Sequence, residues 1–166
     1  MANLSTNYMG LNLSNPIIVG SSGLTNSIEN IKEIEQNGAA AVVLKSLFEE
    51  QINFQISKTM SQTEDSFSYP EAMDYISNYT KQNDVDQYLQ LIRDCKEQVS
   101  IPVIASINCV SSHEWTSFAK KIQDAGADAL ELNVFILPSD PKRNGAQNEE
   151  IYFDIVDKVK KQITIP

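Results

Sequence analysis

Polar side chains follow directly after four short apolar runs of the sequence. The polar sets are Ser21-Ser22-Gly23, Lys45-Ser46, Ser106 to Cys109, and Glu131 to Asn133. Hydroxyl and amide groups donate and accept hydrogen bonds, and a lysine ammonium supplies a positive charge for an electron-rich ligand. Together, these groups would form a binding site for a small polar molecule. Whether they meet depends on the elements that carry them.

The apolar runs are continuous rather than alternating, which is typical of parallel strands buried on both faces. Helical patterns separate them, and glycine closes two of these helices because it readily adopts the left-handed conformation. The polar stretch 48–79 is longer than an ordinary connection and predicts a functional excursion over one end of the fold. The expected strands cover residues 15–20, 40–44, 102–106 and 129–133, and the expected helices cover 27–37, 85–99, a segment from a capping box at 111–114 to Gly126, and 149–162.

An internal repeat relates the two halves of the sequence. Pro16 and Pro102 lie 86 positions apart, and Gly38 and Gly126 lie 88 apart, so each copy is a strand, a helix and a strand. This regular alternation predicts an α/β fold with a parallel sheet, either open or closed into a barrel. No GxGxxG pattern follows the first strand, which argues against an open dinucleotide-binding sheet.

The chain is predicted to form one incomplete domain over residues 1–166. It supplies about four strand-helix units, whereas a (β/α)8 TIM barrel has eight. Residues 163–166 copy the run at 99–102 that opens the third strand, so we expect a fifth strand to begin there and the barrel to continue beyond Pro166. Four strands leave unpaired edges, and we therefore expect a homo-oligomer, in which two copies meet around a twofold axis.

Composition limits the classes of partner. Acidic residues outnumber basic ones by 22 to 13, giving a net charge of −9, which disfavours nucleic acid and anionic membranes and favours a small-molecule substrate. No apolar run approaches the roughly 18 residues of a membrane span, and the N-terminus lacks the pattern of a signal peptide. Cys95 and Cys109 have neither metal-ligand nor disulfide-scaffold spacing. We expect a cytoplasmic protein without a metal.

The ordered motifs resemble those of the dihydroorotate dehydrogenase family along nearly the whole chain. The matching pieces are Asn15-Pro16 through Ser22-Gly23, Gly38 through Lys45-Ser46, Pro102 to Ser106, and Glu131-Leu132-Asn133. The resemblance implies the N-terminal half of a (β/α)8 barrel that binds flavin mononucleotide (FMN). It implies that the flavin is bound by Ser21, Ser22, Gly23, Lys45, Ser46, Ser106 and Asn133.

Within this resemblance, Lys45 would lie beside the reactive end of the flavin ring, where a cation stabilises the charge of the reduced form. Asn133 would bridge flavin and substrate. Each residue also has a simpler interpretation: Lys45 could reach solvent, Ser21 and Ser22 could be turn residues, and Asn133 could join neighbouring strand ends.

Two departures from the family pattern bear on the substrate. Where the family continues into Ser-Cys-Pro-Asn with a cysteine or serine base, this chain reads Val134 to Pro138, and an aliphatic side chain cannot accept a proton. The asparagine-rich substrate loop is replaced by residues 65–71, whose acidic groups would repel the carboxylate of orotate. The catalytic base is therefore unknown. Cys109 is a weak candidate for a substitute base, and a structural role as a buried thiol is the simpler interpretation.

The sequence leaves three functions open. The first is an FMN-dependent oxidoreductase, resembling dihydroorotate dehydrogenase, that acts on a substrate other than dihydroorotate. The second is a catalytically silent flavin-binding or regulatory barrel protein. The third is a barrel enzyme without flavin, such as a phosphate-handling lyase.

Overall fold

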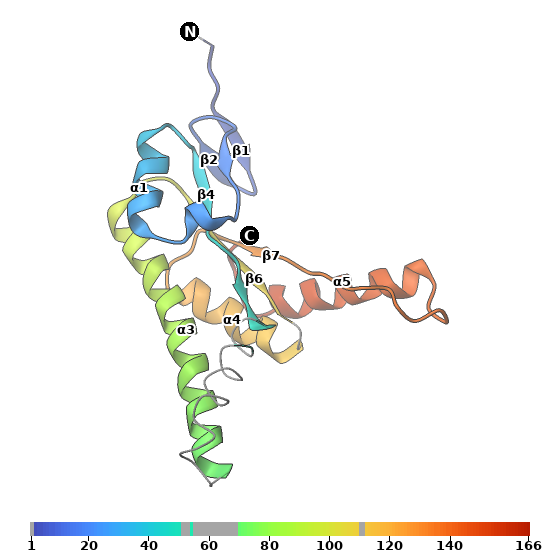
Figure 1. Ribbon diagram of the computed structural model, residues 1–166. Helices are drawn as coiled ribbons and strands as arrows, with labels where there is room; N and C mark the ends of the chain where they lie inside the picture. Colours follow the sequence, from blue (N-terminus) through green and yellow to red (C-terminus); the bar gives the residue numbers. More distant parts are fainter. Residues whose placement is uncertain (1, 51–53, 55–69, 110–111) are drawn as a thin grey trace.

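A parallel sheet forms the centre of the molecule (Figure 1). The computed structural model describes residues 2–50, 54, 70–109 and 112–166. The strands lie in the order β3 (Ile18–Val19), β4 (Ala41–Val43), β6 (Val103–Asn108) and β7 (Ala129–Leu132), and the short β5 (Leu47–Phe48) also pairs with β6. All these pairings are parallel.

Helices connect the strands in the order that the sequence predicts. They are η1 (Gly23–Thr25) and α1 (Ile28–Gln36) after β3, α3 (Pro70–Gln98) before β6, α4 (Ser112–Asp124) before β7, and α5 (Gly145–Lys160) after β7. This alternation of parallel strands and helices confirms the predicted α/β class. No helix in the described part of the chain is long and apolar enough to cross a membrane.

The two faces of the sheet carry different apolar clusters because side chains alternate along each strand. On the helix side, Val42, Val103 and Leu130 join the main core with residues of α3, α4 and α5. On the other side, a smaller cluster packs near the start of the strands, with Leu13 contributed by an N-terminal hairpin. Farther along this second face the strands carry polar residues, which places the polar sets at the C-terminal ends of the strands.

The hairpin was not predicted from the sequence. It consists of β1 (Thr6–Tyr8) and β2 (Leu11–Leu13), which pair antiparallel around Met9 and Gly10. Both turn residues have positive φ, +52° and +83°, as a two-residue hairpin turn requires. The strands are three residues long, too short for alternation to reveal them.

Helix α3 begins 15 residues earlier than the predicted helix, and α5 begins four residues earlier. Residues 70–79 were counted with the polar excursion, although Ala72, Tyr75, Ile76 and Tyr79 have the i, i+3, i+4, i+7 spacing of a helix. Helix α5 starts early because Asn144 and Gln147 form a reciprocal capping box. The apolar positions of the helix expected at 85–99 predict an inward face, which is confirmed as buried: Val85, Tyr88, Leu89, Ile92 and Cys95. Most of the predicted excursion at 48–79 and the start of the capping box at 111–114 lie outside the described residues.

The structure confirms the internal repeat. Gly38 and Gly126 have φ of +89° and +101°, and each donates its backbone N–H to a carbonyl three residues back, in the last turn of α1 or α4. The left-handed backbone at both positions favours glycine and explains why the residue recurs 88 positions apart.

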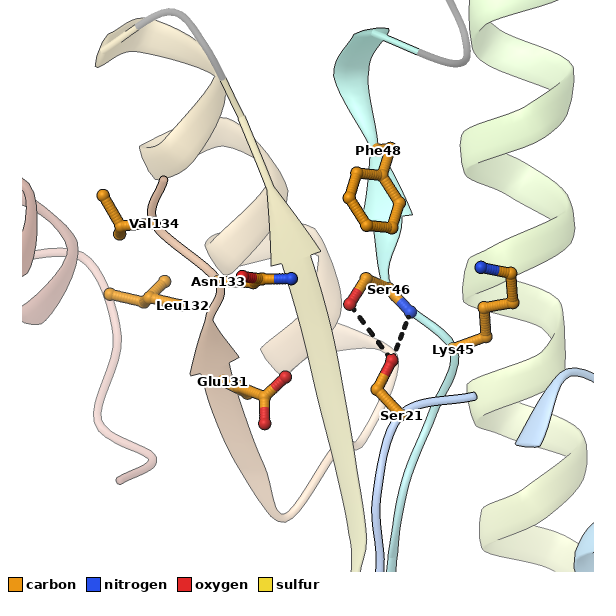
Figure 2. Close-up of a pocket in the computed structure, with 8 residues that line it drawn as sticks. All are labelled: Ser21, Lys45, Ser46, Phe48, Glu131, Leu132, Asn133 and Val134. Atoms are coloured by element: carbon orange, nitrogen blue, oxygen red, sulfur yellow. Dashed lines mark hydrogen bonds between the residues drawn. The ribbon is translucent and has the colours of Figure 1, made fainter. Parts of the chain in front are cut away.

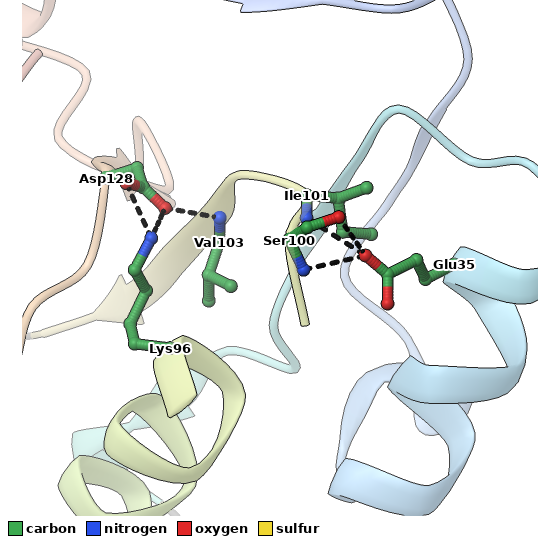
Figure 3. A network of polar contacts seen from close by, with 6 residues as sticks. All are labelled: Glu35, Lys96, Ser100, Ile101, Val103 and Asp128. Atoms are coloured by element: carbon green, nitrogen blue, oxygen red, sulfur yellow. Dashed lines mark hydrogen bonds and ion pairs between the residues drawn. The ribbon is translucent and has the colours of Figure 1, made fainter. Parts of the chain in front are cut away.

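Near the C-terminal ends of α1 and α4, one side chain accepts hydrogen bonds from the two residues that precede a proline, Pro102 for α1 and Pro166 for α4. Glu35 Oε1 accepts hydrogen bonds from Ser100 N at 2.7 Å, Ser100 Oγ at 2.6 Å and Ile101 N at 3.2 Å (Figure 3). Gln123 Oε1 accepts the equivalent bonds from the backbone and hydroxyl of Thr164 and from Ile165 N. Glu35 and Gln123 are themselves 88 positions apart.

These caps place the two following prolines equivalently. Val42 N donates to the carbonyl of Pro102 at 3.1 Å, and Leu130 N donates to the carbonyl of Pro166 at 2.9 Å. Pro166 therefore lies beside β7 as Pro102 lies beside β4, and the strand expected to begin there stays a prediction. Asp128 fixes the start of β6 by accepting from Val103 N while pairing with Lys96 (Figure 3).

Glu35 should make folding stability depend on pH. The hydrogen bond from the Ser100 hydroxyl, with those from the Ser100 and Ile101 N–H groups, lowers the pKa of Glu35 below 4.5. Its charged form therefore stabilises the fold above that pH, and this stabilisation is lost as pH falls through the lowered pKa. We expect Glu35→Gln, which keeps an acceptor as Gln123 does, to cost about 1 kcal/mol or less at pH 7.

Urea unfolding of both proteins between pH 7 and pH 3 measures this effect. The difference in the free energy of unfolding should shrink below pH 4.5. A difference that stays constant over this range would contradict the account of Glu35.

Candidate functional site

The C-terminal ends of the strands surround a cleft of about 580 Å³ (Figure 2). Four of the residues predicted from the sequence meet there, although they are far apart along the chain. The lining residues are Ser21, Lys45, Ser46, Phe48, Glu131, Leu132, Asn133 and Val134. The volume lies within the range of small-molecule sites.

Serine hydroxyls and one carboxylate form a continuous chain across four strand ends. Ser21 Oγ lies 3.1 Å from Ser46 Oγ and accepts a hydrogen bond from Ser46 N at 2.9 Å. Ser46 Oγ lies 2.6 Å from Ser106 Oγ, which donates to Glu131 Oε1 at 2.6 Å. The chain thus links the segments after β3 and β4 with β6 and β7.

Lys45 lies where β4 has ended and before β5 begins. Its backbone N donates to the carbonyl of Thr25 at 3.1 Å. Its ammonium lies 5.5 Å from the centroid of the Phe48 ring, within range of a cation–π interaction. Figure 2 shows Lys45 Nζ on the opposite side of Ser46 from Asn133, so two donor groups flank the serines.

Asn133 is held by its backbone, and its side chain faces the cleft. Its N–H donates to the carbonyl of Ile107 at 2.9 Å, and its carbonyl accepts from Asn108 Nδ2 at 2.8 Å. The role of an amide that joins neighbouring strand ends, which the sequence left open for Asn133, is therefore filled by Asn108. The side-chain amide of Asn133 extends toward Ser46 in Figure 2.

The other three residues predicted to bind the cofactor do not line this cleft. Ser22 caps η1, where its hydroxyl accepts from Leu24 N at 3.2 Å, which is the turn role considered for it. Gly23 is the first residue of η1, and no atom lies within 4 Å of the Cβ position that a larger residue would occupy. Ser106 is fully buried and reaches the cleft only through Ser46 and Glu131.

Sequence reasoning missed Phe48 and Glu131 as individual site residues. Glu131 lies on β7, two positions before Asn133, which directly follows the strand. A period of two places both side chains on one face. That signal was present in the sequence. Phe48 had none, because its position depends on the separate short strand β5.

Cys109 lies in a neighbouring pocket of about 500 Å³. This pocket shares Phe48, Asn133 and Val134 with the cleft and is completed by apolar residues that include Trp115 and Ile136. Cys109 is only 8% exposed, and neither Cys95 nor Cys109 forms a disulfide bond. Among the residues that the structure describes, no group of three or more His, Cys, Asp or Glu could hold a metal ion.

Tyr88 fills a gap in the sheet beneath the cleft. The ladder between β4 and β6 ends near Ile104, and β5 resumes the pairing at Ile107. In the gap, the Tyr88 hydroxyl accepts from Ser106 N at 2.8 Å and donates to the carbonyl of Ser106 at 3.0 Å. Burial raises the pKa of the Tyr88 hydroxyl well above its usual range, and the charge of Glu131 adds to this effect.

Comparison with known proteins matches the chain to one family. The model of the family described as dihydroorotate dehydrogenase matches residues 3–166. The catalytic subunit of dihydroorotate dehydrogenase B (NAD(+)) from Thermoplasma acidophilum is 30% identical over 176 aligned positions, covering all of this chain and 53% of the relative. The subunits of the same name from Thermoplasma volcanium and Methanocaldococcus jannaschii are 28% and 27% identical, covering 100% and 98% of this chain. The chain spans about half the length of these relatives.

The gap filled by Tyr88 leads to a prediction about stability. Tyr88→Phe removes the hydroxyl that bonds the buried N–H and carbonyl of Ser106, and we expect a loss of about 2–4 kcal/mol in the free energy of unfolding. The matched control Tyr152→Phe, at a 38% exposed position of α5, should change stability by about 0.5 kcal/mol or less. Urea denaturation measures both variants. Equal effects would show that the Tyr88 hydroxyl does not complete the sheet.

Proposed function

The chain belongs to the dihydroorotate dehydrogenase family, and from this premise we propose that it binds FMN in the cleft and acts as a flavin-dependent oxidoreductase. The family fold is a (β/α)8 barrel, in which ligands bind at the C-terminal ends of the strands. The observation that carries the proposal is the meeting of Ser21, Lys45, Ser46 and Asn133 at those ends.

The residues present fit a flavin ring. FMN, when bound, supplies the chemistry of electron and hydride transfer. The Lys45 ammonium would stabilise negative charge on the ring, while Ser21 and Asn133 would orient its polar edge through hydrogen bonds. Leu132 and Val134 give the same cleft an apolar side, as an aromatic ring requires.

We further propose that the substrate is not dihydroorotate. The segment after Asn133 provides Val134, Phe135 and Ile136, and none of these side chains can accept a proton. Cys109 is a candidate substitute, because its pocket shares Asn133 with the cleft, but the thiol is buried. Of the acidic segment 65–71, residues 65–69 lie outside the described part of the chain.

The same aliphatic segment favours a second candidate function. A protein that keeps the flavin-binding groups and lacks a base would be a catalytically silent flavin-binding or regulatory protein. Bleaching of the yellow protein by a reductant, followed by reoxidation by an acceptor with turnover, would distinguish the enzyme from the silent protein.

The relatives are named catalytic subunits, and we extend to this chain the expectation that it works with a protein partner. A homo-oligomer is the form that we propose. Light scattering measures the mass of the protein in solution and so tests whether it is a homo-oligomer.

Lys45 provides the first functional prediction. Lys45→Ala should weaken FMN binding about ten- to hundredfold, or shift the reduction potential of the bound flavin to more negative values, because a charged contact with the reduced ring is lost. Fluorescence titration and a spectroelectrochemical titration measure the two quantities. The control Lys121→Ala, on α4 away from the cleft, should change neither. An unchanged Lys45→Ala variant would refute the role of Lys45.

The second functional prediction concerns the substrate. We expect no measurable orotate formation from dihydroorotate with excess FMN and several electron acceptors. A turnover of roughly 1–1000 per second would contradict the proposal. Activity that rises in Ile136→Cys but not in Ile136→Ala would identify the missing base as the cause.

A further inference from the structure

The hydroxyl chain beneath the cleft has a direction that its carboxylate end determines. Ser106 Oγ donates to Glu131 Oε1 at 2.6 Å, a length typical of a hydrogen bond to a charged carboxylate. An ionised carboxylate can only accept, and a serine hydroxyl has a single proton. The proton of Ser106 is therefore committed to Glu131.

The donor assignment at Ser106 also decides which hydroxyl donates in the two contacts between serines. Since Ser106 has no proton left, Ser46 must be the donor in the 2.6 Å contact between their hydroxyls. Ser46 then has no proton for Ser21, so Ser21 donates in the 3.1 Å contact. Ser21 Oγ also accepts from Ser46 N, which leaves it one lone pair and no proton for any other group.

The inner end of the hydroxyl chain is buried away from water, and its outer end is exposed. Ser106 is 0% exposed and Ser46 is 7% exposed, so solvent does not compete for their hydroxyls. The exposed Ser21 lines the cleft. Chains of hydrogen bonds in a buried setting strengthen one another, which lets a charge at one end influence the other.

We propose that Glu131 is a positioning residue that orients the serine chain and so makes Ser21 a hydrogen-bond acceptor toward the ligand. The ligand part of this inference rests on the proposed flavin function. Lys45 and Asn133 supply donors on either side of Ser21, so the complementary ligand edge has acceptors flanking an N–H donor. Carbonyl groups beside a ring N–H, as in a flavin or a pyrimidine, form such an edge.

The first arm of the test needs no ligand. We expect the effects of Glu131→Leu, which removes both the charge and the acceptor, and of Ser21→Ala on the unfolding equilibrium constant in urea to be non-additive by about twofold or more, because the two residues are linked through Ser46 and Ser106. The non-additivity should vanish in a Ser106→Ala background. Glu97→Leu, at an exposed position of α3, removes the same charge and should combine additively with Ser21→Ala.

The second arm uses riboflavin, which presents the ring without the phosphate. Glu131→Leu, which leaves no acceptor for the Ser106 hydroxyl, should raise the Kd for riboflavin about three- to tenfold and should add nothing in the Ser106→Ala background. Additive unfolding effects, or an equal loss of riboflavin affinity in both backgrounds, would overturn the positioning role. If the unaltered chain binds no riboflavin, the flavin function fails, and the unfolding arm alone decides the role of Glu131.

Discussion

The interruption between β4 and β5 is the constraint on which the site depends. Strand β4 ends at Val43 and β5 begins at Leu47, so the intervening residues leave the ladder beside β6. Lys45 and Ser46 are thereby free to face the cleft, and the backbone of Ser106 loses its strand partner. The Tyr88 hydroxyl bonds the Ser106 backbone in place of that partner. The Ser46 hydroxyl contacts the side chain of Ser106. The lining of the cleft and the hydrogen bonds that complete the sheet therefore share the same few groups.

Much of the fold could be predicted because glycine and proline mark each repeated unit. The left-handed backbone at Gly38 and Gly126 cannot be adopted easily by other residues, so these positions appear directly in the sequence. The meeting of Ser21, Lys45, Ser46 and Asn133 could also be predicted, because parallel strands bring their C-terminal ends to one edge. The position of Pro166 beside β7 follows from the same repeat.

The remaining features depend on contacts that periodicity does not encode. Tyr88 was predicted as an inward residue of a helix, but its hydroxyl serves a gap that only the interruption of β4 creates. The hairpin and β5 are too short to show alternation. Glu131 was named only as part of a strand end, although its alternation with Asn133 places it on the cleft face. Its link to Ser106, 25 positions earlier on the neighbouring strand β6, required the three-dimensional arrangement.

The central claim is that a flavin ring binds among the strand ends that carry Ser21, Ser46 and Asn133. The most direct measurement is a titration of the isotopically labelled chain with FMN, followed by the backbone amide resonances in nuclear magnetic resonance spectra. The account predicts saturable shifts at Ser21, Ser46 and Asn133, with little change at Gly38 at the opposite end of the strands. Absence of shifts at the three cleft residues, or shifts confined to the region around Gly38, would contradict it.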